Sequence, residues 1–259
     1  MRGPCGPHPL TGGVTFSDDE IERYARHLVL AEVGGPGQQR LKAARVGLIG
    51  LGGVGAPAAL YLAAAGVGTL RLVDDDTVAL SNLQRQIAFG AADVGLAKVE
   101  AGAATLTALN PYVRIEPVAA RLTAENAAGL IEGCDVVIDG TDDFATRFAV
   151  NAACMEARIP LVSGALGRWS GQVGVFTGRP CYRCLVPAGP PDAETCARVG
   201  VVGALAGVVG SMAALETIKL IAGAGASLAG RLLIYDGLAG TARTALVAAD
   251  PACPVCSAA

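Results

Sequence analysis

Short apolar runs alternate with longer segments of helical character over the first two thirds of the chain. Runs rich in Val, Ile and Leu predict strands at 46–50, 69–74, 113–118, 135–139 and 160–163. Helices are predicted between them at 56–65, 98–109 and 144–157. Strands that alternate with helices at this spacing are typical of an α/β fold with a doubly wound, mainly parallel sheet.

The pattern changes after Gly171. Strands are predicted at 172–177, 231–235 and 241–247, with joins that are short or are interrupted by an apolar helix at 201–221. Short joins favour antiparallel neighbours. We therefore expect these strands to extend the same sheet, within a single domain that covers residues 15–259.

The beginning of the chain predicts a tail followed by a helix. Residues 1–14 are rich in Gly and Pro and predict a disordered tail. Ser17 and Glu20 have the spacing of a capping box, which predicts a helix from there to about Leu30. The run Gly34-Gly35-Pro36-Gly37 is predicted to break it.

Composition excludes several classes of protein. The chain has 259 residues, of which 52% are apolar and 17% charged, and its net charge is −3. That much apolar material argues against a mainly disordered chain. The absence of a long basic run argues against nucleic acid as a main ligand.

The mean hydropathy of +0.47 raises the question of a membrane. The apolar segments 46–70 and 199–215 are long, but both are interrupted by glycines, and the second runs directly into Glu216 and Lys219. We interpret both as buried elements of an α/β fold. The first residues have no apolar core of a signal peptide, so the sequence predicts no membrane partner and a cytoplasmic location.

A glycine-rich turn follows the first predicted strand. The run Gly50-Leu51-Gly52-Gly53-Val54-Gly55 fits G-x-G-x-x-G, and Asp74 closes the next strand 19 residues after Gly55. Such glycines let the backbone approach a phosphate at a helix N-terminus, and the acidic residue can bind ribose hydroxyls. The run predicts a Rossmann-like nucleotide site without saying which nucleotide, and NAD is the default interpretation.

Further polar residues follow the same strands and change this interpretation. They are Asp76, Ser81, Asn82, Arg85, Lys98, Asp142 and Asp143. Ligands of open α/β sheets bind at the carboxyl ends of the strands. Mg-ATP needs cations around the polyphosphate and a carboxylate for the metal, which a dehydrogenase does not. The alternative is that these are solvated loop charges.

Four of the eight cysteines form two Cys-x-x-Cys pairs, Cys181/Cys184 and Cys253/Cys256. Two such pairs together match the four-thiolate set of a structural zinc site. A disulfide framework is the weaker interpretation because the chain shows no secretion signal. A redox role would require a single pair at a helix start in a thioredoxin-like unit, which the pattern does not predict.

Cys196 lies in a polar stretch just before the apolar helix, with Arg198 nearby. A position near a helix N-terminus can lower a thiol pKa, so Cys196 is a candidate nucleophile. An inert thiol is the equal alternative.

Taken together, these motifs resemble the MoeB/ThiF family of ubiquitin-activating-type adenylyltransferases. The matching runs are Arg23-Tyr24-Ala25-Arg26, the glycine turn, Asp74-Asp75-Asp76-Thr77-Val78, Ser81-Asn82-Leu83-Gln84-Arg85-Gln86, Lys98-Val99, Thr141-Asp142-Asp143 and both cysteine pairs. They follow the family's order over roughly residues 17–257.

The resemblance implies a homodimer that uses ATP and Mg²⁺ to adenylate the C-terminal Gly-Gly carboxylate of a ubiquitin-like sulfur-carrier protein. It implies that Gly50, Gly52, Gly53 and Gly55 cradle the nucleotide and that Asp74 binds ribose. Asn82, Arg85 and Lys98 are expected to hold the phosphates, and Asp142 to hold Mg²⁺. Arg26 is expected to reach the partner subunit's site as an arginine finger, and Zn²⁺ to bind the four cysteines.

Three features depart from the family pattern. Ala97 replaces the usual proline before Lys98, which is a mild change. Asp143 stands where Asn is common after the metal-binding aspartate. The sequence shows no sulfurtransferase segment after Cys256, so a separate sulfur donor is expected. Two other function classes compete with the adenylyltransferase: an NAD-dependent oxidoreductase, which leaves Arg85, Lys98 and Asp142 unexplained, and a non-catalytic scaffold that binds the carrier.

Overall fold

A computed structural model describes residues 15–189 and 200–257. The predicted tail at 1–14 and Cys196 lie outside the described residues. The eight strands of the described residues form one sheet, in the order β3-β2-β1-β4-β5-β6-β7-β8. Their bounds are β1 Arg45–Ile49, β2 Thr69–Val73, β3 Arg114–Val118, β4 Val136–Asp139, β5 Leu161–Leu166, β6 Ser170–Phe176, β7 Arg231–Asp236 and β8 Thr241–Leu246.

Both halves of the predicted sheet are confirmed. The pairs β3-β2, β2-β1, β1-β4 and β4-β5 are parallel. The pairs β5-β6, β6-β7 and β7-β8 are antiparallel. The strand order reverses from β1 outward, with β2 on one side and β4 on the other, which is the switch point where such sheets bind ligands.

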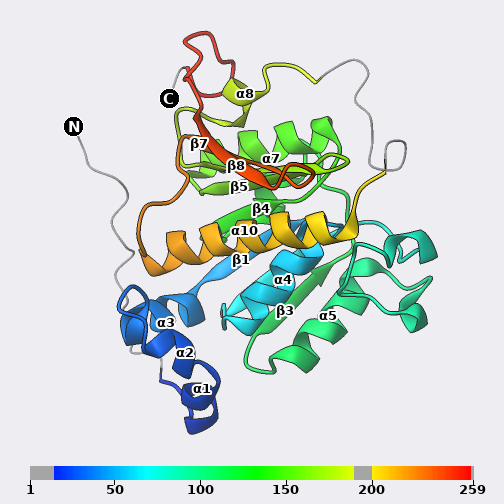
Figure 1. Ribbon diagram of the computed structural model, residues 1–259, viewed down its shortest axis with the longest axis vertical. Coiled ribbons are helices and arrows are strands. Elements are labelled where there is room, and N and C mark those ends of the chain that lie inside the picture. Colours follow the sequence, from blue (N-terminus) through cyan, green and yellow to red (C-terminus); the bar gives the residue numbers. More distant parts are fainter. Residues whose placement is uncertain (1–14, 190–199, 258–259) are drawn as a thin grey trace.

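Helices cover both faces of the sheet (Figure 1). The helices α4 (Gly55–Ala64), α5 (Lys98–Leu109) and α10 (Gly203–Ala222) lie on one face, and α7 (Phe144–Ala157) lies on the other. Neighbouring strand residues divide between the two faces: Leu48 packs in the cluster beneath α4 and α10, and Ile49 packs in the cluster beneath α7. Alternation of this kind buries both faces of the parallel strands.

Helix α10 is long and apolar enough to span a membrane by those two criteria alone. In the fold it packs along α4 and the sheet, and a Cβ at Gly210 would lie 2.4 Å from Pro57 Cγ. Its buried Glu216 accepts from the Leu228 backbone N–H at 2.7 Å. The apolar character of this helix is therefore explained by its packing inside the protein.

The N-terminal segment differs from the prediction. The capping box is present, with Ser17 Oγ accepting from Glu20 N at 3.3 Å, but α1 (Asp18–Arg23) ends at Tyr24 and α2 (Ala25–Leu28) continues after a bend. The helical segment ends at Leu28, close to the predicted Leu30, but the glycine run is not the loop that was expected, because α3 (Gly34–Ala43) begins there. Pro36 lies in the first turn of α3, where its missing N–H has no intrahelical partner to lose.

Four one-turn helices were not predicted: η1 (Leu80–Asn82), η2 (Ala91–Asp93), α6 (Ala127–Ile131) and α8 (Tyr182–Leu185). Each is too short for a hydrophobic repeat to show in the sequence. Two of them, η1 and α8, border the candidate sites described below.

Candidate functional site

The glycine turn between β1 and α4 brings the backbone close to the end of β4. Gly50 has a φ of +83°, which favours glycine, and a Cβ there would lie 3.2 Å from Thr141 N. A Cβ at Gly55 would lie 1.9 Å from the Gly50 carbonyl oxygen. The turn is thus closed by contacts that admit no side chain, and it leaves the N-terminus of α4 facing open space.

That space is a cavity of about 540 Å³ at the carboxyl ends of the central strands. Most of the predicted nucleotide-binding residues line it: Gly50, Gly52, Gly53, Asp74, Asp76, Asn82, Arg85, Lys98, Asp142 and Asp143. They come from five separate stretches of the chain, which the fold brings to one cavity. Gly55 lies behind the turn, and Ser81 is exposed on η1, where its carbonyl accepts from Arg85 Nη1 at 2.9 Å.

Asp74 and Lys98 form a polar wall of this cavity, next to the carboxyl end of β2. Asp74 Oδ2 accepts from Leu51 N at 2.6 Å, which ties the carboxylate to the glycine turn. Lys98 is 5% exposed, and its Nζ lies 2.7 Å from Asp76 Oδ2 and 3.9 Å from Asp74 Oδ1. Burial raises the pKa of Asp74, although the Lys98 ammonium and the two backbone donors oppose this effect. The wall therefore holds a buried cation beside two carboxylates.

The segment 82–86, which begins with the last residue of η1, supplies amide and guanidinium groups. Asn82 Oδ1 accepts from Ala79 N at 3.1 Å, which fixes the start of η1. Gln86 lines the cavity but was not chosen from the sequence. It is 3% exposed, and its Oε1 has no hydrogen-bond partner within the described chain. A buried amide oxygen without a partner is costly, which makes Gln86 a further candidate contact for a ligand.

The two carboxylates after β4 have different environments. Asp142 is exposed in the cavity and forms no hydrogen bond to any described residue. Asp143 instead caps α7, since its carboxylate accepts from Ala145 N and from the Thr146 N and Oγ1. The Thr146 hydroxyl, helped by backbone donors and Arg121, lowers the pKa of Asp143. Of the two, Asp142 is free to bind a cation. Asp and Asn are about equally good N-cap residues, so Asp143 caps α7 as well as the Asn of the family pattern would.

Arg147 is the main cavity residue that sequence reasoning missed. It is 6% exposed, yet its guanidinium donates to Gly164 O at 2.9 Å, to Ser163 Oγ at 3.2 Å and to Thr141 O. Burial opposes its charge and is the largest single effect, but Asp139 Oδ2 at 3.6 Å, together with Tyr182 and Asp142, outweighs it and raises the pKa of Arg147. An arginine in an amphipathic helix ordinarily points to solvent, so only its burial identifies it.

Arg26 does not lie at the cavity. It is exposed on α2, and the neighbouring Tyr24 packs against Gly66 and accepts from Asn110 Nδ2 at 2.9 Å. Gly66 and Asn110 precede β2 and β3, so this contact lies at the amino ends of the strands. The cavity lies at their carboxyl ends. A five-residue strand such as β2 separates the two ends by about 16 Å.

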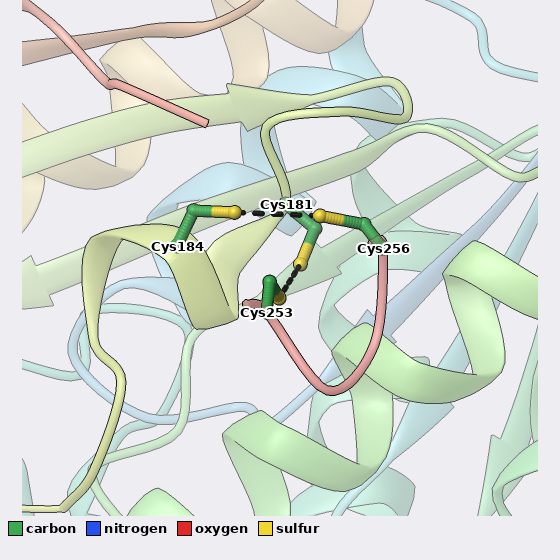
Figure 2. Close-up of side chains that lie close together, drawn as sticks. All are labelled: Cys181, Cys184, Cys253 and Cys256. Atoms are coloured by element: carbon green, nitrogen blue, oxygen red, sulfur yellow. Dashed lines mark hydrogen bonds between the residues drawn. The ribbon is translucent and has the colours of Figure 1, made fainter. Parts of the chain in front are cut away.

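The four cysteines of the two pairs come together near α8 (Figure 2). Their sulfurs lie within 4.8 Å of one another, with Cys181 and Cys253 3.7 Å apart and Cys184 and Cys256 3.3 Å apart. Four sulfurs around a zinc ion, each bonded at about 2.3 Å, stand about 3.8 Å from one another. The Asn151 amide and the Asp250 N–H point donors at Cys181 Sγ and Cys184 Sγ. The residues therefore fit Zn²⁺.

A second cavity, of about 550 Å³, adjoins the first, and Arg121, Leu122, Asp143 and Thr146 line both. Its lining includes Arg183, which lies between Cys181 and Cys184, and Val255, which lies between Cys253 and Cys256. The guanidinium of Arg183 lies 4.1 Å from the ring centroid of Phe148 on α7. The cysteine cluster is thus packed against the same helix that borders the glycine-turn cavity.

Comparison with known proteins agrees with this arrangement. The chain is 44% identical over 250 residues to "Sulfur carrier protein adenylyltransferase" of Thermus thermophilus, covering 93% of this chain and 92% of that protein. It is 48% identical over 247 residues to "Adenylyltransferase and sulfurtransferase MOCS3" of Anopheles gambiae, covering 93% of this chain but only 56% of that longer protein.

The fold is shared more widely. The crystal structure of Escherichia coli MccB with MccA-N7isoASN matches with a TM-score of 0.81 at 22% identity, over 95% of this chain and 76% of that one. At this identity the likeness concerns the fold alone. The model of the ThiF family, however, matches residues 24–255, which is nearly the whole described chain, and the protein belongs to the ThiF family.

Proposed function

We propose that this protein is a nucleotidyltransferase that uses Mg-ATP to adenylate the C-terminal Gly-Gly carboxylate of a ubiquitin-like sulfur-carrier protein. The observation that carries the proposal is the cavity itself, where Arg85, Lys98 and Asp142 converge on the N-terminus of α4. A nicotinamide cofactor would use the glycine turn and Asp74 but would leave these three side chains without a role.

The reaction is an in-line displacement at the α-phosphorus of ATP. A carboxylate oxygen of the carrier forms a bond to that phosphorus while the bond to the bridging oxygen of pyrophosphate breaks. The products are the carrier acyl-adenylate and pyrophosphate. Most of the rate enhancement comes from orientation of the reactants and neutralisation of charge, because no proton needs to be removed from the attacking carboxylate.

The glycine turn and the polar side chains around it divide the roles in this scheme. The glycine turn and the N-terminus of α4 face the phosphates, and Asp74 accepts from the ribose hydroxyls. Asn82, Arg85 and Lys98 hold the phosphate oxygens, with Lys98 leaving Asp76 as the nucleotide enters. Asp142 is the residue that would hold Mg²⁺, which neutralises the pyrophosphate leaving group when it is bound.

The active form is proposed to be a homodimer in which Arg26 completes the partner's site. The helix of Arg26 packs at the amino ends of the strands, whereas its own cavity lies at the carboxyl ends, about 16 Å away along β2. Exposed apolar side chains on the adjoining helices α4 and α10, Tyr61 at 56% and Leu215 at 57% exposed, supply a surface that a second copy can cover.

Zn²⁺ at the four cysteines is proposed to be structural. It joins the turn at Cys181 to the segment at Cys253, which lie far apart in the chain. All four positions of a tetrahedral site are occupied by sulfur, so no position is left for a substrate. The sulfur that the activated carrier receives is expected from a separate donor. Names of the relatives point to sulfur-carrier activation, while the pathway that this chain serves is set by which carrier it binds.

ATP–pyrophosphate exchange tests the proposal directly. Labelled pyrophosphate should enter ATP only when a Gly-Gly-tailed carrier from the same genome is present, and Asp142→Ala should abolish the exchange while the carrier still binds. Binding of NAD without binding of ATP would favour the oxidoreductase. Carrier binding without exchange in the wild-type protein would favour the scaffold.

A further inference from the structure

Arg147 grips the peptide that precedes Asp142. Its guanidinium donates to the Thr141 carbonyl, while Asp139 Oδ1 accepts from the Thr141 N–H at 3.0 Å and from its hydroxyl at 2.7 Å. Asp139 and Arg147 are themselves paired at 3.6 Å. Thr141, the residue before Asp142, is therefore held at its N–H and hydroxyl by Asp139 and at its carbonyl by Arg147, the two members of one buried ion pair.

The same guanidinium also approaches the side chain of Tyr182, which lies in the first cysteine turn. Arg147 Cζ lies 6.0 Å from the ring centroid of Tyr182, the residue between Cys181 and Cys184 in the first cysteine turn. Tyr182 is 3% exposed, and its ring is packed between Phe148 and Phe176. A cation this close to an aromatic face is attracted to it.

A second contact runs parallel to the first. Asn151 lies one turn after Arg147 on α7 and is 1% exposed. Its Oδ1 accepts from Tyr182 N at 2.9 Å, and its Nδ2 donates to Cys181 Sγ at 3.6 Å. Arg147 and Asn151 therefore join one helix face to the cysteine turn, and Arg147 alone continues to the loop of Asp142.

We propose that Arg147 is a positioning residue that links the Cys181–Cys184 turn to the loop of Asp142, and that this link sets the Mg²⁺ requirement of nucleotide binding. The inference rests on the function proposed above, in which Asp142 holds Mg²⁺. An ordered cysteine turn therefore stabilises the protein and, through Tyr182 and Arg147, also fixes the position of the Asp142 loop at the cavity.

The test is ATP binding by calorimetry at graded Mg²⁺ concentrations, which needs no carrier. Arg147→Lys keeps the charge but cannot reach Thr141, Gly164 and Ser163 together, so the Mg²⁺ concentration for half-maximal affinity should rise about tenfold. Tyr182→Leu should raise it in the same direction. In the double variant, the fold increase in the Mg²⁺ requirement should be smaller than the product of the two single increases, because both substitutions act on one link.

Phe176→Leu is the matched control. It removes a ring from the same aromatic cluster, 5.8 Å from Tyr182, without touching Arg147. It should lower the melting temperature much as Tyr182→Leu does, but leave the Mg²⁺ requirement unchanged. An Mg²⁺ requirement that is unchanged in folded Arg147→Lys, or that shifts equally in Phe176→Leu, would overturn the link. If the wild-type protein bound no ATP, the proposed function would fail and this inference with it.

Discussion

Lys98 and Asp76 are joined twice: Lys98 N donates to the Asp76 carbonyl at 3.0 Å, and Lys98 Nζ lies 2.7 Å from Asp76 Oδ2. The residues open α5 and follow β2, and the pair lies at the wall of the glycine-turn cavity. The backbone bond fixes where the lysine enters, and the ammonium is buried where phosphate oxygens would lie. Asp76 is largely exposed, so it can be solvated when the ammonium turns to a nucleotide.

The first prediction concerns that ammonium. Lys98→Ala should lower kcat/KM for adenylation by at least about 100-fold, or about 2.7 kcal/mol, because phosphate charge is then unopposed at the wall. Stability should fall less than activity, since the exposed Asp76 carboxylate regains water and the buried Asp74 carboxylate keeps its backbone donors from Leu51 and Asp76. Pyrophosphate exchange and thermal melting measure the two effects.

Lys219→Ala is the matched control, because Lys219 pairs with Glu216 on α10 and does not line the cavity. It should keep wild-type exchange activity. Equal losses in the two variants would argue that Lys98 is only a structural cation.

The second prediction concerns the cysteine cluster. The purified protein should carry about one zinc ion per chain, and Cys181→Ser should release it and lower the melting temperature by more than about 5 °C, because structural metal binding contributes folding free energy. Elemental analysis and melting with and without chelator measure this.

Cys134→Ser is the control, since Cys134 is also buried but lies apart from the four-cysteine cluster. It should keep its metal. A metal-free protein that is equally stable with chelator would contradict the zinc assignment.

The third prediction follows from the cap of α7. Asp143→Ala should destabilise the protein by about 1 kcal/mol at neutral pH, as loss of an N-cap usually does. Its hydrogen bonds lower the pKa of Asp143, so the carboxylate stabilises the fold above its unfolded pKa, and this contribution is lost as the pH falls through the folded value.

The difference in unfolding free energy between wild type and Asp143→Ala should therefore shrink in acid. Denaturant unfolding at pH 7 and at successively lower pH measures it. Asp143→Asn keeps an N-cap acceptor and should retain most of the stability at neutral pH. A difference that grew as the pH fell would contradict the sign of the shift.

The fourth prediction concerns Arg26 and the homodimer. Arg26→Ala should lower adenylation about 1,000-fold while the protein stays dimeric, because an arginine supplied by a partner stabilises the transferring phosphate. Co-expression with Asp142→Ala should restore up to about half of the activity, since one site of each mixed dimer holds Asp142 from one chain and Arg26 from the other.

Heterodimers purified with two different tags, assayed for pyrophosphate exchange, provide the measurement. The control is a dimer in which both chains carry Asp142→Ala and only the tags differ. It should stay inactive. No recovery in verified heterodimers would mean that Arg26 acts within its own chain or only packs.

Much of the fold could be predicted from local patterns. The residue order Gly50 to Gly55 after an apolar run is sufficient for a strand, a tight turn and a helix, and Lys98–Leu109 and Phe144–Ala157 were predicted with the bounds that the structure has. The two Cys-x-x-Cys pairs predicted one cluster, although 68 residues separate them. In each case the signal is a spacing within a short segment, which the sequence displays directly.

What the tertiary structure decided depends on burial and on distances across the sheet. The glycines at 34–37 were predicted to break a helix, but α3 begins there, and Gly37 is buried in it where a Cβ would lie 3.0 Å from Val33 Cγ1. Arg147 and Gln86 are ordinary polar residues in the sequence, and only their burial at the cavity sets them apart. Arg26 matches a motif, yet the sequence alone does not show that its helix packs at the amino ends of the strands while Asp142 follows the carboxyl end of β4. Local pattern determines which elements form, whereas long-range packing determines which side chains meet, because contacts between distant segments leave no periodic trace in either one.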